Sequence, residues 1–137
     1  MALPDSAKLT IGTYLLVADS TDYADNQGFG TRTDQIDLTS LAAGAARQSA
    51  KLDFTANIDL EYVLGASIEF ATAPAAGETI DFYLGYSNSG TAGTNNPGGL
   101  SGSDAAYTGY SSNLDESLKQ LVYLGSMVAT VQATTTV

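Results

Sequence analysis

Hydrophobic and polar residues alternate along the chain most regularly between residues 62 and 70. Tyr62, Leu64, Ala66, Ile68 and Phe70 fall on one side of this pattern. Because successive side chains of a strand point to opposite faces, the pattern predicts a half-buried β-strand. The same period returns in residues 79–86, with inward positions at Ile80, Phe82, Leu84 and Tyr86. Turn-forming residues at 73–77 separate the two segments, so we expect an antiparallel hairpin.

Further segments have the composition of strands. Residues 8–17 are rich in β-branched and aromatic side chains, residues 48–54 alternate with Ala50, Leu52 and Phe54 inward, and residues 36–38 are a short candidate. Residues 121–131 are apolar on both faces, which indicates a strand buried between layers or lying at a subunit contact. These segments together predict five or six strands.

One short segment has helical spacing. In residues 113–120, Asn113 is a candidate N-cap with Glu116 three positions later, and Leu114, Leu118 and Leu121 share one face. The pattern predicts an antiparallel all-β protein with one short helix and long loops. We expect a single structural unit in which residues 1–35 form an N-terminal strand and extended arm and residues 36–137 form the β domain.

Two segments lack periodicity and are candidates for contact with other molecules. Residues 19–30 carry several acidic residues, and residues 87–112 contain six glycines and six serines but one charged residue, Asp104. Loops of this length in compact domains are usually functional or disordered. Tyr107 and Tyr110 can anchor residues 87–112 on a surface, so we expect an ordered loop against a partner, with a flexible solvent loop as the alternative. The strands are expected to fold without residues 93–102.

Charge and residue types exclude several classes of function. Fifteen acidic and five basic residues give a net charge of −10, which disfavours direct nucleic-acid binding. The chain has no cysteine and no histidine, so it lacks disulfides, thiolate metal sites, the usual general base and the commonest zinc ligand. No segment is apolar over the roughly 18 residues of a membrane span, and the N-terminus lacks the pattern of a secretion signal. We expect no enzyme activity, cofactor, metal or membrane partner.

Two groups of acidic residues could still carry chemistry. Asp19, Asp22, Asp25 and Asn26 offer oxygen ligands, but their spacing differs from an EF-hand loop, so a solvated acidic turn is favoured over a Ca²⁺ site. Glu69 and Asp81 lie on the outward faces of the strands expected to pair, where they could act as the acid and base of a glycoside hydrolase. Outward acids are ordinary on a one-sided sheet, so this interpretation is disfavoured.

Three segments resemble small structural proteins encoded in the head-gene modules of tailed bacteriophages. They are residues 71–84 (ATAPAAGETIDFYL), residues 95–110 (NNPGGLSGSDAAYTGY) and residues 114–121 (LDESLKQL). The similarity extends over residues 55–137, and it implies that residues 36–137 form an antiparallel β-sandwich of the jelly-roll type. Proteins of this kind carry further strands after the part that matches residues 129–137. The resemblance therefore leaves three alternatives: the sandwich closes differently here, a neighbouring subunit completes it, or the product continues.

The resemblance implies a capsid decoration, or cement, protein on the outer surface of the virion, made in the host cytoplasm. Such a protein bridges copies of the phage major capsid protein, and we expect a homo-oligomer, with a trimer favoured. The residues expected to contact the capsid are Tyr23, Phe29, Arg32, Asn95, Asn96, Pro97, Leu100, Tyr107 and Tyr110.

The main alternative is a carbohydrate-binding, lectin-like module on a virion or cell surface. Eight tyrosines without any tryptophan fit a shallow sugar-binding surface, although they fit contacts within a protein assembly better. Tyr83 is one of the tyrosines expected to face outward.

Overall fold

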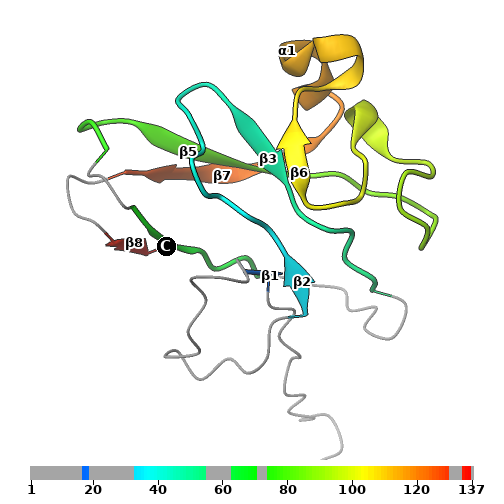
Figure 1. The fold of residues 1–137 in the computed structure, drawn as a ribbon, viewed down its shortest axis with the longest axis horizontal. Coiled ribbons are helices and arrows are strands. Elements are labelled where there is room, and N and C mark those ends of the chain that lie inside the picture. Colours follow the sequence, from blue (N-terminus) through cyan, green and yellow to red (C-terminus); the bar gives the residue numbers. More distant parts are fainter. Residues whose placement is uncertain (1–16, 19–32, 55–62, 71–73, 130–133, 137) are drawn as a thin grey trace, which may run out of the picture.

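A computed structural model describes residues 17–18, 33–54, 63–70, 74–129 and 134–136 of the chain. These residues form mostly short strands with a single α-helix, so the all-β class is confirmed at this level (Figure 1). The strands are β1 (Val17–Ala18), β2 (Asp34–Gln35), β3 (Ala46–Gln48), β4 (Ser67–Glu69), β5 (Thr79–Leu84), β6 (Ala105–Tyr107), β7 (Val122–Val128) and β8 (Thr134–Thr136). The helices are the 3₁₀ turns η1 (Pro97–Gly99) and η2 (Tyr110–Ser112) and the α-helix α1 (Leu114–Leu118).

The strands pair into four sheets of two strands each. β3 pairs with β6, β4 with β8 and β5 with β7, all antiparallel, whereas β1 and β2 pair in parallel. The predicted hairpin between residues 62–70 and 79–86 is wrong, because each of these segments pairs with a strand near the C-terminus. Alternation along one segment specifies which side chains share a face, but it does not specify the partner strand.

The β5–β7 pair is the longest ladder and confirms two of the predicted strands. Its register runs from Thr79 opposite Val128 to Leu84 opposite Val122, with an irregularity between Phe82 and Tyr83. Leu124 is the extra residue of β7 at this point, since Phe82 lies opposite Gly125 and Tyr83 opposite Tyr123. A bulge of this kind bends the strand and changes the direction of nearby side chains.

Other predicted strands differ in extent. β2 precedes the expected residues 36–38, β3 ends where the expected strand 48–54 begins, and β4 covers three residues of the expected 62–70. Of the expected strand 8–17, only Val17 lies within the described residues, where it belongs to β1. Two predicted inward positions are wrong, because Leu64 is 58% exposed and Tyr86, beyond the end of β5, is 67% exposed.

The predicted helix is present as α1, and its N-cap is confirmed. The Asn113 side-chain oxygen accepts a hydrogen bond from the backbone N–H of Glu116, which satisfies one of the free donors of the first turn. Together with η1, β6 and η2, this helix forms a cap of residues 97–121 at one end of the described structure (Figure 1). The sheet of β4 and β8 lies away from this cap.

Few large side chains are fully buried in the described part of the chain. Its buried hydrophobic residues are Tyr107, Met127 and Ala129. By contrast, nine large hydrophobic residues are exposed there: Leu41, Val63, Leu64, Tyr86, Tyr110, Val122, Tyr123, Leu124 and Val128. Much of the apolar surface of these small sheets therefore remains available for contact with other molecules.

Candidate partner-contact surfaces

The loop of residues 87–104, which leads into the cap, is organised around the ammonium group of Lys51. The Nζ atom of Lys51 donates to Ser87 Oγ at 2.9 Å, Asn96 Oδ1 at 3.0 Å and the carbonyl oxygens of Thr91 and Thr94 at 3.1 and 3.3 Å. Its backbone N–H donates to the carbonyl of Gly102 at 3.0 Å. Four oxygen atoms thus converge on one positive charge, which fixes the path of residues 87–96.

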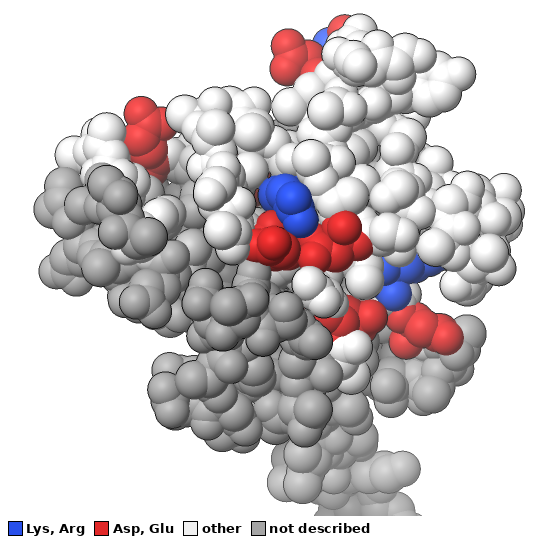
Figure 2. Space-filling model, viewed as in Figure 1, with Lys and Arg blue, Asp and Glu red and all other residues white. Residues whose placement is uncertain are grey.

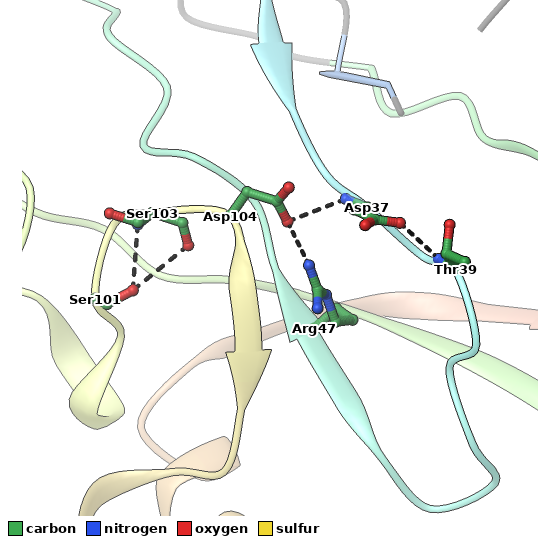
Figure 3. A network of polar contacts seen from close by, with 6 residues as sticks. All are labelled: Asp37, Thr39, Arg47, Ser101, Ser103 and Asp104. Atoms are coloured by element: carbon green, nitrogen blue, oxygen red, sulfur yellow. Dashed lines mark hydrogen bonds and ion pairs between the residues drawn. The ribbon is translucent and has the colours of Figure 1, made fainter. Parts of the chain in front are cut away.

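Asp104 attaches the far end of the same loop to two other segments (Figure 3). Its Oδ1 atom accepts from Arg47 Nη2 at 2.9 Å and from the backbone N–H of Asp37 at 3.0 Å. Arg47 lies on β3 and Asp104 immediately precedes β6, so the ion pair reinforces the pairing of these strands. Both side chains are largely buried, at 22% and 14% exposure, which shields the pair from solvent.

The cap is packed around Tyr107. This side chain is 5% exposed, and its hydroxyl donates to the carbonyl of Gly98 at 2.6 Å. Gly98 has φ +62°, and a Cβ atom here would lie 2.7 Å from the Tyr107 hydroxyl and 2.8 Å from the Ser117 carbonyl oxygen. Only glycine fits this position without strain. The Ser117 hydroxyl, also buried, accepts from the Tyr110 N–H and donates to the Asn113 carbonyl.

The predicted contact residues therefore differ in how much surface they offer. Asn95 and Tyr110 are exposed, the latter at 72%, whereas Asn96, Pro97 and Leu100 are half-buried. Tyr107 contributes to the interior of the cap instead of its outer surface. Tyr23, Phe29 and Arg32 lie outside the described residues, as do Asp19, Asp22, Asp25 and Asn26.

An aromatic and acidic cluster lies on the outward face of the β5–β7 sheet. The rings of Tyr83 and Tyr123 are 5.4 Å apart with their planes tilted by 58°. Ser126 Oγ donates to Asp81 Oδ1 and also bonds to the Tyr123 hydroxyl. Glu69 does not belong to this cluster's ladder, because β4 pairs with β8 and not with β5. The strand pairing assumed for a Glu69 and Asp81 catalytic pair is therefore wrong.

A small cavity opens beside the bulge of the same sheet. It has a volume of about 110 Å³ and is lined by Leu64, Ala66, Phe82, Leu124, Gly125 and Ser126. Leu64 and Leu124 are 58% and 46% exposed, so the cavity reaches the surface. The sequence shows that residues 121–131 are apolar on both faces, and this pattern indicated a contact role for β7. The sequence placed Leu64 on an inward face, and it gave no signal that Leu64 would be exposed at the edge of this cavity.

Two ion pairs lie within the described residues. Lys119 pairs with Glu116 at 2.7 Å on the exposed side of α1, in addition to the Arg47–Asp104 pair. Figure 2 shows few basic side chains on one face, lying close to acidic ones and surrounded by large uncharged areas. Among the described residues there is no group of three or more potential metal ligands, and no helix there is long and apolar enough to cross a membrane.

Two titratable groups have shifted pKa values. Burial raises the pKa of the Tyr107 phenol above its ordinary value, and a side-chain interaction with Ser117 partly opposes this shift. Burial and the nearby charge of Asp53 raise the pKa of the Asp34 carboxyl.

Comparisons with known protein families, curated proteins and solved structures found no match for this chain. The resemblance to bacteriophage head proteins thus stays a prediction.

Proposed function

We propose that this chain is a capsid decoration, or cement, protein that binds the outside of a bacteriophage head and bridges neighbouring major capsid proteins. The observation that carries the proposal is the contrast in burial. Within the described residues, three hydrophobic side chains are buried and nine large ones are exposed. A subunit that completes its packing against neighbours has this distribution, since assembly covers apolar surface that the isolated chain leaves in water.

The preorganised loop of residues 87–104 supports the same proposal. Lys51 and Asp104 anchor its two ends, while Asn95 between them stays exposed. Tyr110 follows on the cap with 72% of its surface exposed. A loop that is already ordered loses less conformational entropy on binding, so it can hold a partner through a modest contact area.

In this proposal, assembly on the capsid lattice makes attachment to the head stronger than any single contact would. Many copies attached to one head are linked through each other and through the capsid, so each further contact is effectively intramolecular. We propose further that the strands belong to a β-sandwich of the jelly-roll type and that the protein acts as a homo-oligomer, with a trimer favoured. In this proposal, the protein lies on the outer surface of the virion.

The test is attachment to heads. Purified chain is mixed with heads of the encoding phage that lack it, and binding is measured by co-sedimentation. We expect saturable binding and a rise in the temperature at which the heads melt. Tyr110→Asp should weaken binding at least about tenfold, because it places a charge on an exposed contact side chain.

Glu78→Gln is the matched control, because Glu78 is also exposed but lies in the turn before β5, outside the loop and the cap. It should bind like the unaltered chain, and circular dichroism should show both variants folded. Wild-type chain that fails to sediment with such heads would contradict the proposal.

A further inference from the structure

We propose that the outward face of the β5–β7 sheet holds a binding site for neutral sugars, formed by Tyr83, Tyr123, Ser126 and Asp81. This site goes beyond capsid attachment and uses other residues than the loop and the cap. The argument rests on the geometry of the cluster, on its unused hydrogen-bonding capacity and on its charge.

The two tyrosine rings form a corner in place of a flat surface. They come from directly opposite positions of paired strands, with centroids 5.4 Å apart and planes tilted by 58°. Tyr123 is 54% exposed, so one ring face is accessible. An accessible aromatic face can pack against the C–H groups of a pyranose ring, while the second ring limits how the sugar lies.

The hydrogen bonds of the cluster fix the direction of each donor. Ser126 has one hydroxyl proton, and it donates this proton to Asp81 Oδ1. The Tyr123 hydroxyl must then donate to Ser126 Oγ. This chain of bonds holds Asp81 and Tyr123 in place before any ligand binds, which lowers the entropic cost of binding.

Asp81 keeps hydrogen-bonding capacity for a ligand. Among the described residues, no hydrogen bond reaches its Oδ2 atom and no cation pairs with it. Of the chain's five basic residues, the three in the described ranges are engaged elsewhere: Arg47 with Asp104, Lys51 with the loop and Lys119 with Glu116. A carboxylate oxygen is a strong acceptor for sugar hydroxyls, because its charge strengthens each bond.

The charge of the site selects the class of sugar. Asp81 and a net charge of −10 repel sialic acids, uronic acids and sugar phosphates. Neutral hexoses and their N-acetylated forms carry hydroxyl donors and no charge, so they fit both the carboxylate and the rings. An open face of this kind gives weak single-site binding, with a dissociation constant of the order of 1 mM, which many copies on one particle would strengthen.

The experiment uses the full chain displayed in many copies on fluorescent beads. The beads are applied to immobilised glycans that end in galactose, glucose, mannose or N-acetylglucosamine, and to sialylated counterparts. We expect binding to at least one neutral class and little to the sialylated glycans. Tyr123→Ala and Asp81→Asn should each lower the signal at least about tenfold, whereas Tyr110→Ala, at an exposed tyrosine of the cap, should leave it unchanged.

A second measurement decides the matter if Tyr123→Ala does not fold. The unaltered chain is titrated with the methyl glycoside of the best neutral sugar, and backbone amide shifts are followed by NMR. Shifts centred on residues 81–83 and 123–126 support the site. Shifts elsewhere, no binding to any neutral glycan, preference for sialylated glycans, or equal losses in Tyr110→Ala would each overturn it. Head attachment is measured separately, so either proposal can fail alone.

Discussion

Lys51 shows how one side chain organises a long polar loop. Its ammonium group contacts four oxygens from Ser87, Thr91, Thr94 and Asn96. The loop has too few apolar side chains to form a core of its own, so this charge takes the place of hydrophobic packing. Nothing in the sequence marks Lys51 for this role, because its partners lie 36 to 45 positions away.

Replacing Lys51 with methionine should loosen the loop. The change keeps most of the apolar stem and removes the charge, and we expect a loss of about 1–3 kcal/mol in the free energy of unfolding. Urea denaturation followed by circular dichroism measures this loss. Lys119→Met is the control, since Lys119 forms an exposed pair worth less than about 1 kcal/mol. Equal effects of the two substitutions would show that the Lys51 contacts do not stabilise the loop.

The raised pKa of Tyr107 predicts that the stability of the folded chain decreases at alkaline pH. Its pKa is raised in the folded chain, mainly by burial, so folding favours the neutral phenol. The unfolded chain releases this proton near pH 10, before the folded chain does. The stabilisation is therefore complete below about pH 10 and is lost as the pH rises through the folded pKa.

Tyr107→Phe separates this effect from the others. The variant loses the hydrogen bond to Gly98 and should be about 1 kcal/mol less stable at pH 8. Its stability should then fall less steeply between pH 9 and 11 than that of the unaltered chain. Thermal melts across this range measure both effects, with Tyr110→Phe, on an exposed side chain, as the control. Parallel pH curves for the Tyr107 variant and the unaltered chain would refute the assignment.

At the scale of elements, residues 93–102 are part of the fold. The sequence indicated that the strands do not need them, but the segment makes several contacts with residues outside it. The segment supplies the carbonyls of Thr94, Gly98 and Gly102 to Lys51 and Tyr107, and the Ser101 N–H donates to Gln48 Oε1 at 2.7 Å. Leu100 and Pro97 also pack against Gly85, at which a Cβ atom would lie 2.4 Å from Leu100 Cδ1.

Deleting residues 93–102 should consequently destabilise the whole chain. We expect a loss of at least about 3 kcal/mol, because several polar groups lose their partners at once. Circular dichroism and urea denaturation test this. Asn95→Gly is the control: this residue has φ +54°, which glycine adopts freely, and its side chain bonds only the exposed Asn88. A deletion variant as stable as this control would show that the strands fold without residues 93–102.

At the scale of the whole molecule, the described residues form small sheets with few buried side chains, and the chain carries a net charge of −10. Residues 121–137 carry no charged side chain. Copies of an acidic chain repel each other least where such uncharged surface meets, and Figure 2 shows wide uncharged areas on one face.

This charge distribution predicts how self-association responds to salt. Raising the ionic strength from about 0.02 M to 0.5 M screens the repulsion between acidic copies, so the proposed homo-oligomer should become tighter. Sedimentation velocity at several protein concentrations measures the change. Val128→Lys, on the uncharged strand β7, should weaken association if this strand is the contact. Association that falls as salt rises would instead point to ion pairs between copies.

Local features were predictable from the sequence, because they depend on neighbouring residues. The period of two predicted β5, the apolar run of residues 121–131 predicted β7, and the spacing of Asn113 and Glu116 predicted the N-terminus of α1. The absence of histidine and cysteine likewise excluded disulfides, thiolate metal sites and histidine as a general base or zinc ligand. Only the tertiary structure decided which strands pair, that Tyr107 is buried while Tyr110 is exposed, and that Lys51 holds the loop. These outcomes depend on contacts between residues far apart in the chain, and a local period carries no information about the partner it will meet.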